Sequence, residues 1–244
     1  MLLRPLLPAA LALAGLVMAS PLRAAPSLQA LQDALNSSSA EALTAVLEPG
    51  NGLDPDEVLR RRLLLRDQFP DARWTVQPGA PLKDGRATTQ INVTGSRDEG
   101  PYRFRFEAQQ QLVLGASGNR FNSQEVIRST SELRSGDNNL KLSMLIPDAV
   151  LTGQRYDLDV VFDEPLNGAV IAGALKPVSV GELLRMRTPD LQLEALGGGG
   201  IFKSAQAPYQ PGTQTWAVLL VHPDGIVAAS KQVRVVADRS ALTF

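Results

Sequence analysis

Cysteine is absent from this chain of 244 residues, and histidine occurs once, as His222. Without cysteine the protein has no disulfide framework, no thiol nucleophile and no thiolate ligands for zinc or an iron–sulfur cluster. A single imidazole also excludes metal sites built from several histidines, and it leaves one candidate for a histidine base. We therefore expect a chain that is stabilised by packing and that carries no metal or other cofactor.

Neither sign of charge dominates, because 24 Lys and Arg residues face 25 Asp and Glu residues for a net charge of −1. Such a balance gives no reason to expect nucleic acid or an anionic membrane as the main partner. Hydrophobic residues make up 44% of the chain, which is enough for a real core. We expect a folded protein of one large domain or two ordinary ones.

Residues 1–24 have the order of a secretory signal peptide. Arg4 precedes an uncharged and mostly apolar run over residues 5–22, and small residues follow it. We expect cleavage between Ala24 and Ala25, which makes the mature protein an exported one, periplasmic or extracellular. The alternative is an uncleaved membrane anchor, since a run of about 18 residues lies at the lower limit of what spans a bilayer.

The residues after this segment predict three helices. Apolar residues recur at spacings of three and four, and Ser27 and Asp54 stand where helix caps are expected. Pro55 after Asp54 fits the first helical position. We expect the third helix to end near Gln68 and to hold the arginines Arg60, Arg61, Arg62 and Arg66 on a solvated face.

Long strands are expected next. Apolar and polar side chains alternate over residues 102–114, which is the pattern of a strand buried on one face, and residues 120–134 return beside it. Three helices followed by long antiparallel strands indicate an α+β domain over residues 27–135, with the helices packed on a curved antiparallel sheet.

From residue 140 the sequence changes to short strands separated by turn signals, about seven strands in 100 residues, as in a β-sandwich. We expect an all-β domain over residues 140–238 and a tail over 239–244. His222 lies directly before the turn of the last hairpin, and no Gly-x-Ser-x-Gly elbow accompanies it, so we interpret it as a turn residue. Asp157 and Asp159 are interpreted as outward carboxylates rather than a calcium site, because no twelve-residue loop pattern surrounds them.

The order of elements over residues 27–135 resembles the nuclear-transport-factor-2-like (cystatin-like cone) superfamily. That superfamily includes ketosteroid isomerases and many non-catalytic binding modules, so the resemblance implies a cone that can hold a pocket. Residues 140–238 resemble a bacterial immunoglobulin-like domain, mainly over residues 153–158 and in the closing hairpin, although the cysteine pair of antibody domains is missing.

An isomerase or dehydratase in such a cone needs a carboxylate or imidazole in an apolar pocket, where desolvation raises its pKa. The inward face of residues 102–114 carries neither group. Glu125, which alternation places on the face of Phe121 and Ile127, is the one strand candidate. We assign no catalytic residue and take as candidate pocket residues Trp74, Tyr102, Phe104, Phe106 and Glu125.

These observations favour an exported, non-catalytic binding or interaction protein of the cell envelope. The alternative is a small apolar ligand-binding protein, or an isomerase- or dehydratase-type enzyme, that uses the cone pocket. We expect the partner to be a protein or a small apolar ligand, and a second copy of the chain is an open alternative. A membrane is expected as partner only if the signal segment is not cleaved.

Overall fold

The computed structural model describes residues 26–136, 140–163, 169, 171–179, 182, 192–196 and 199–242. The predicted signal segment and its cleavage site at Ala24 and Ala25 lie outside these residues. Three helices open the described chain: α1 (Leu28–Asn36), α2 (Glu41–Val46) and α3 (Pro55–Gln68). Ser27 caps α1 by accepting a 3.0 Å hydrogen bond from the amide of Ala30, and Asp54 caps α3 through the amide of Asp56. The three predicted helices are confirmed.

Strands make up most of the described residues. The first four are β1 (Arg73–Gly79), β2 (Thr88–Glu99), β3 (Tyr102–Ser117) and β4 (Arg120–Ser135). Eight more follow: β5 (Leu142–Leu145), β6 (Ala149–Leu151), β7 (Arg155–Phe162), β8 (Ile171–Val178), β9 (Glu194–Leu196), β10 (Gly200–Gln206), β11 (Gly212–His222) and β12 (Gly225–Val236). A 3₁₀ helix, η1 (Arg239–Leu242), lies within the predicted tail.

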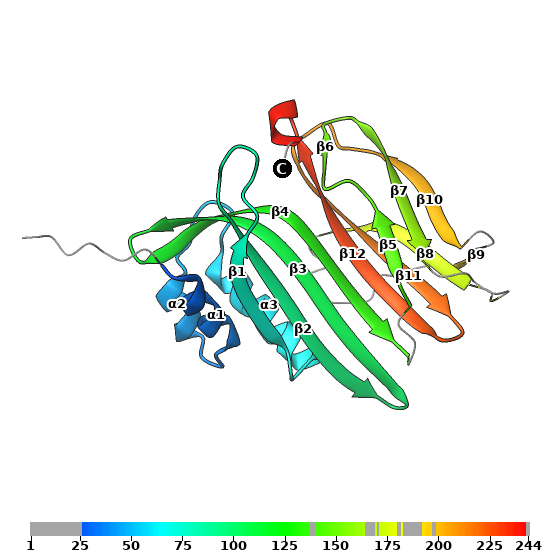
Figure 1. The fold of residues 1–244 in the computed structure, drawn as a ribbon, viewed down its shortest axis with the longest axis horizontal. Coiled ribbons are helices and arrows are strands. Elements are labelled where there is room, and N and C mark those ends of the chain that lie inside the picture. The colour runs from blue at the N-terminus through cyan, green and yellow to red at the C-terminus, as the bar shows by residue number, and fades with distance from the viewer. Residues whose placement is uncertain are drawn as a thin grey trace, which may run out of the picture.

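The strands form one long sheet and one short one (Figure 1). The nine-stranded sheet runs in the order β1-β2-β3-β4-β12-β11-β8-β9, with β6 paired to β12 as well, and the three-stranded sheet is β10-β7-β5. β4 and β12 join the two halves of the long sheet through an antiparallel ladder from Thr130 opposite Lys231 to Arg134 opposite Val227. The sheet is therefore continuous from β1 to β9.

The predicted fold class, an α+β cone followed by a separate immunoglobulin-like sandwich, is wrong. The chain is mostly β, and a large antiparallel sheet runs through both predicted regions. The reason is the pairing of β4 with β12, two strands that lie about 90 residues apart in the sequence. Alternation within each strand gives no information on such a distant partner.

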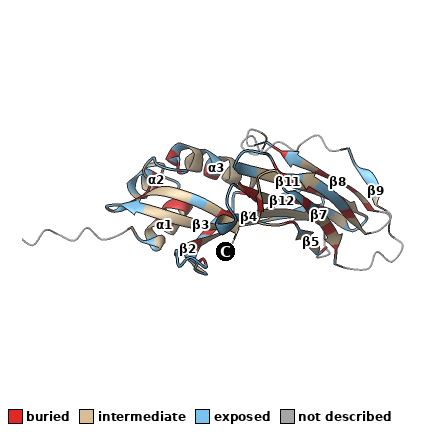
Figure 2. Ribbon diagram, turned by 90° about the horizontal axis from the view of Figure 1, so that it is seen from above, coloured by how far each residue is buried: buried red, intermediate tan, exposed pale blue. Residues whose placement is uncertain are grey.

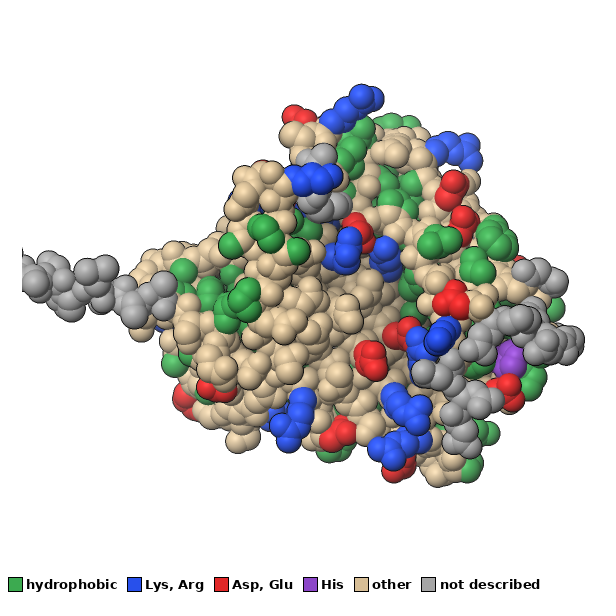
Figure 3. All heavy atoms as spheres, viewed as in Figure 1, with side chains coloured by type: hydrophobic (Ala, Val, Ile, Leu, Met, Phe, Trp, Pro, Cys, Tyr) green, Lys and Arg blue, Asp and Glu red, His purple; other side chains and the backbone are tan. Residues whose placement is uncertain are grey.

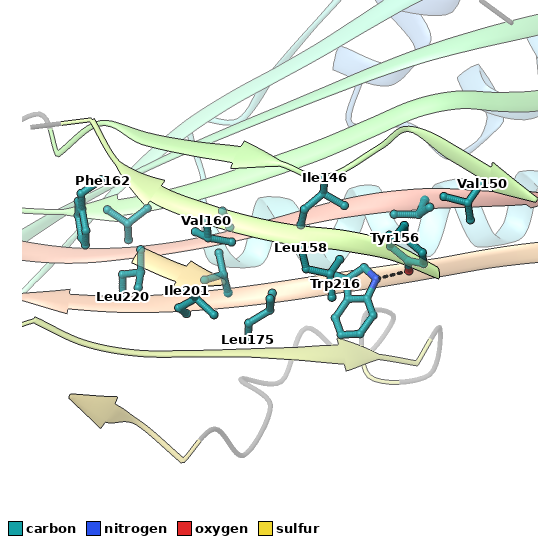
Figure 4. Packing of buried hydrophobic residues seen from close by; sticks show 14 of the residues in the cluster. Ile146, Val150, Tyr156, Leu158, Val160, Phe162, Leu175, Ile201, Trp216 and Leu220 are labelled. Carbon is teal, nitrogen blue, oxygen red and sulfur yellow. Dashed lines mark hydrogen bonds between the residues drawn. The ribbon is translucent and has the colours of Figure 1, made fainter. Parts of the chain in front are cut away.

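Two layers cover opposite faces of the long sheet at its two ends (Figures 1 and 2). The helices lie behind β1–β4, where they enclose one apolar core, and the three-stranded sheet lies in front of β12, β11 and β8, where it encloses a second. Figure 4 shows the second core, in which the indole of Trp216 donates a 2.8 Å hydrogen bond to the hydroxyl of Tyr156. Within the described part of the chain no further layer covers the front face of β1–β4, and this face is hollowed beside the short sheet (Figure 3). The register places uncharged polar side chains there, among them Gln77, Gln90, Asn92, Gln109 and Gln111.

Candidate ligand-binding cavity

A cavity of about 160 Å³ lies between the three helices and the back face of β1–β4. Twelve of the sixteen described lining residues are apolar, and they come from α1, α3, the linker between α2 and α3, and β1–β4: Leu31, Leu35, Leu47, Leu53, Val58, Leu65, Trp74, Ile91, Val93, Leu112, Leu114 and Val126. The four polar lining residues are Arg61, Arg62, Gln110 and Gln124. The cavity is therefore an apolar space with a few polar groups in its wall, which is the usual composition of a small-molecule site.

Side chains of α1 hold the helix against the edge strand β1. The Asn36 side chain donates to the carbonyl of Trp74 (2.7 Å) and accepts from the amide of the same residue (3.1 Å). Gln32 accepts a 2.9 Å hydrogen bond from the amide of Val76. These bonds satisfy backbone groups that an edge strand otherwise leaves unpaired, and they fix Trp74 in the cavity wall.

The linker between α2 and α3 closes the cavity at β4. The amide of Glu48 donates to the carbonyl of Phe121 (2.8 Å), and the amide of Gln124 donates to the carbonyl of Asn51 (3.0 Å). A Cβ at Gly50 would lie 1.8 Å from the carbonyl oxygen of Asn122, so only glycine allows this approach. The linker thereby positions Leu47 and Leu53 in the cavity wall.

Glu125 does not belong to this cavity, which corrects its predicted place beside Phe121. Gln124 and Val126 line the cavity, so the residue between them points to the opposite face of the sheet. The cause is a bulge: Gly115 pairs with Ser123 and Ala116 with Phe121, which leaves one extra residue on β4 and reverses the alternation.

The carboxylate of Glu125 instead joins two arginines on the front face. Its Oε2 lies 2.6 Å from Nη1 of Arg86, and its Oε1 lies 3.4 Å from Nη1 of Arg234 on β12. Through these two ion pairs Glu125 links β4 to the loop before β2 and to β12.

The other candidate pocket residues are spread along the helix-facing side of the sheet. Trp74 lines the cavity. Phe106 stacks on Phe69 with ring centroids 5.1 Å apart, and Phe104 lies under the guanidinium of Arg97, so both fill space beyond the cavity. Tyr102 is 58% exposed at the start of β3. The structure therefore does not bring the five residues together, because a strand of 16 residues is longer than the layer of helices that covers it.

Arg62, which we predicted to lie on a solvated face of the third helix, lines the cavity. Its side chain is 3% exposed, and its Nη1 donates to the carbonyls of Ala34 (3.0 Å) and Ser37 (3.1 Å) while Nη2 donates to Ser39 (3.1 Å). Burial, with a smaller contribution from the charge of Arg66, lowers the pKa of Arg62 from its ordinary value. The spacing of Val58, Arg62, Leu65 and Phe69 places Arg62 on the apolar stripe of α3, and this was the signal in the sequence.

His222 and the aspartates of β7 lie outside the cavity. Nδ1 of His222 accepts a 3.1 Å hydrogen bond from the amide of Asp224, as expected of a turn residue. Within the described ranges, no group of three or more His, Cys, Asp or Glu residues is arranged to hold a metal ion. None of the helices in the described part of the chain has the length and apolar character needed to cross a membrane.

Residues 137–236 match the model of a domain of unknown function, DUF8623. The matched segment contains β5 to β12 and none of the residues that line the cavity. No curated protein matches the chain.

Proposed function

We propose that the protein is a non-catalytic binding protein that holds a small apolar ligand in the cavity between the helices and β1–β4. The observation that carries this proposal is the composition of the wall: twelve apolar side chains surround about 160 Å³ of space. An apolar cavity of about 150 Å³ takes up a molecule the size of benzene. A ligand with about six apolar carbon atoms fits this space.

Binding is favoured over catalysis because of the groups in the wall. An isomerase or dehydratase needs a carboxylate or imidazole that faces the substrate. The described lining residues include neither, and Glu125 lies on the other face of the sheet. The polar groups that are present, two guanidinium groups and two amides, are suited to orienting a ligand.

The place of action that we propose is the periplasm or the extracellular space. This part of the proposal rests on the signal-like order of residues 1–24. Mass spectrometry of the protein from the exported fraction tests it, since a mature chain that begins at Ala25 is expected. A chain that stays in the cytoplasm with residues 1–24 attached would contradict export and would leave the cavity proposal untouched.

The binding proposal is tested by NMR titration of the protein with hexan-1-ol. Wild-type protein is expected to show saturable shifts of the methyl groups that line the cavity. Val93→Phe fills the cavity from β2 and is expected to abolish these shifts. The matched control is Val113→Phe, because Val113 is half-buried on the opposite face of the same sheet. Saturable binding that survives Val93→Phe, or no binding to the wild type, would contradict the proposal.

A further inference from the structure

We infer that the cavity binds a small amphiphile whose carboxylate head lies at the buried guanidinium of Arg62. This inference rests on the proposed function, since it concerns the ligand of the same cavity. The apolar wall alone indicates an apolar ligand, and the inference adds a negatively charged head group to that ligand.

The first observation is the charge of the cavity wall. The described lining residues include two arginines and no carboxylate. The charge of Arg61 is compensated by Glu57, one helical turn away, with which it forms an ion pair. Arg62 has no carboxylate within ion-pair distance among the described residues, so it is a buried cation without a counter-ion. Buried charges in proteins are normally paired.

The second observation is a donor without an acceptor. The terminal nitrogens of Arg62 donate to three backbone carbonyls. Its Nε is buried and has no hydrogen-bond partner in the described structure. Nearly all buried donors in proteins have a partner, so this orphan N–H leaves the guanidinium one acceptor short.

The carbonyls that hold Arg62 do not neutralise it. They belong to the end of α1 and the residues after it, and a helix C-terminus carries about half a negative charge. A second guanidinium, that of Arg66, donates to the carbonyls of Ser37 (3.0 Å) and Asn36 (2.5 Å) in the same place. Two full positive charges therefore share one helix end, and neither has a carboxylate within ion-pair distance among the described residues.

A carboxylate suits this site better than a phosphate. Beside the charge of Arg62 the described wall has only the amides of Gln110 and Gln124 as further polar groups without a charge, whereas a phosphate has three strong acceptor oxygens to satisfy. A carboxylate needs fewer donors, and a short alkyl chain attached to it fills the apolar remainder of the cavity. Hexanoate is a probe with these properties, and hexan-1-ol is its neutral match.

The test compares the affinity of the full chain for hexanoate and hexan-1-ol at pH 7, measured by NMR titration. We expect hexanoate to bind at least about tenfold more tightly, and its binding to shift the ¹⁵N–¹H signal of Arg62 Nε, which hexan-1-ol leaves in place. Arg62→Gln is expected to remove the preference. Arg60→Gln is the matched control, because Arg60 is exposed on the same helix and does not line the cavity, and it is expected to retain the preference.

The outcomes separate the two proposals. Equal affinity for both probes, with both abolished by Val93→Phe, would overturn the carboxylate head and keep the cavity ligand. Loss of the preference in Arg60→Gln would show that it follows the overall charge of the helix and not Arg62, and would also overturn the inference. Failure of both probes to bind would overturn the proposed function itself. If Arg62→Gln does not fold, the Nε signal of the wild-type protein decides.

Discussion

Nη1 of Arg62 donates a 3.0 Å hydrogen bond to the carbonyl of Ala34, 28 residues earlier in the chain. This bond and its two neighbours join the middle of α3 to the end of α1, and they hold a full positive charge beside an apolar cavity. The same side chain therefore stabilises the layer of helices and gives the cavity wall its charge.

Replacement of Arg62 by Ala is expected to destabilise the protein by about 3 kcal/mol. The change removes three charge-assisted hydrogen bonds and leaves backbone carbonyls without their partner. Urea unfolding followed by circular dichroism measures the difference. Arg60→Ala is the control, since Arg60 is exposed on the same helix, and it is expected to change stability by less than about 0.5 kcal/mol. A loss below about 1 kcal/mol for Arg62→Ala would show that these bonds do not hold the helices.

Replacement of Tyr156 by Phe is expected to cost about 1–3 kcal/mol of stability. The hydroxyl accepts from the indole of Trp216 and donates to Gln214, both at 2.8 Å, so its removal leaves a buried indole N–H without an acceptor. Burial raises the pKa of Tyr156 above its ordinary value, which is consistent with a hydroxyl that stays protonated. Tyr209→Phe is the control. Tyr209 is 79% exposed and its hydroxyl accepts a 2.9 Å hydrogen bond from the exposed side chain of Gln206, so the change is expected to be near neutral. Equal effects of the two substitutions on the unfolding midpoint would contradict this role of Tyr156.

Ser96→Ala is expected to raise the pKa of Asp71 toward its ordinary value. The Ser96 hydroxyl and amide each donate a 2.6 Å hydrogen bond to the Asp71 carboxylate, and they lower its pKa, the hydroxyl more than the amide. A carboxyl group whose pKa is lowered by folding contributes stability above its unfolded pKa of about 3.9 and loses it as the pH falls through the folded value. Part of that acid-dependent loss should disappear in Ser96→Ala. An NMR titration of the carboxyl carbons measures the shift, and an unchanged Asp71 pKa in the variant would contradict the assignment.

Glu125→Gln is expected to leave the affinity for hexanoate and hexan-1-ol unchanged. Its carboxylate faces away from the cavity and pairs with the half-exposed Arg86, so the stability change is expected to stay below about 1 kcal/mol. The same NMR titration measures both affinities. A change of fivefold or more in either one would place Glu125 in contact with the ligand and favour the pocket that the sequence alone predicted.

Local patterns in the sequence predicted much of the local structure. The caps at Ser27 and Asp54 give the starts of α1 and α3, and the alternation from Tyr102 onward gives β3. Each of these features depends on neighbours within a few residues, which is the range over which a pattern of side chains specifies structure. The closing hairpin around Gly225 was predicted in the same way, from its local turn residues.

The remaining features depend on distant contacts. β4 pairs with β12, which begins about 90 residues later, and this pairing places strands of both predicted regions in one sheet. A single extra residue at Asn122 moved Glu125 to the other face, and its only local mark among the paired residues is Gly115 on β3, which alternation does not register. Arg62 lies in a run of arginines that is typical of a solvated helix, and it is buried because the end of α1 supplies its acceptors. The cavity wall was therefore predicted only in part, through Trp74.

Intermolecular nuclear Overhauser effects between bound hexanoate and the protein test the binding site itself. The protein is expected to show contacts from the alkyl protons of hexanoate to the methyl groups of Leu35, Val93 and Val126, and contacts from the protons beside the carboxylate to Arg62. Contacts to the exposed side chains of Leu145 and Phe202 on the short sheet, with none to the three cavity methyl groups, would contradict a ligand site between the helices and β1–β4.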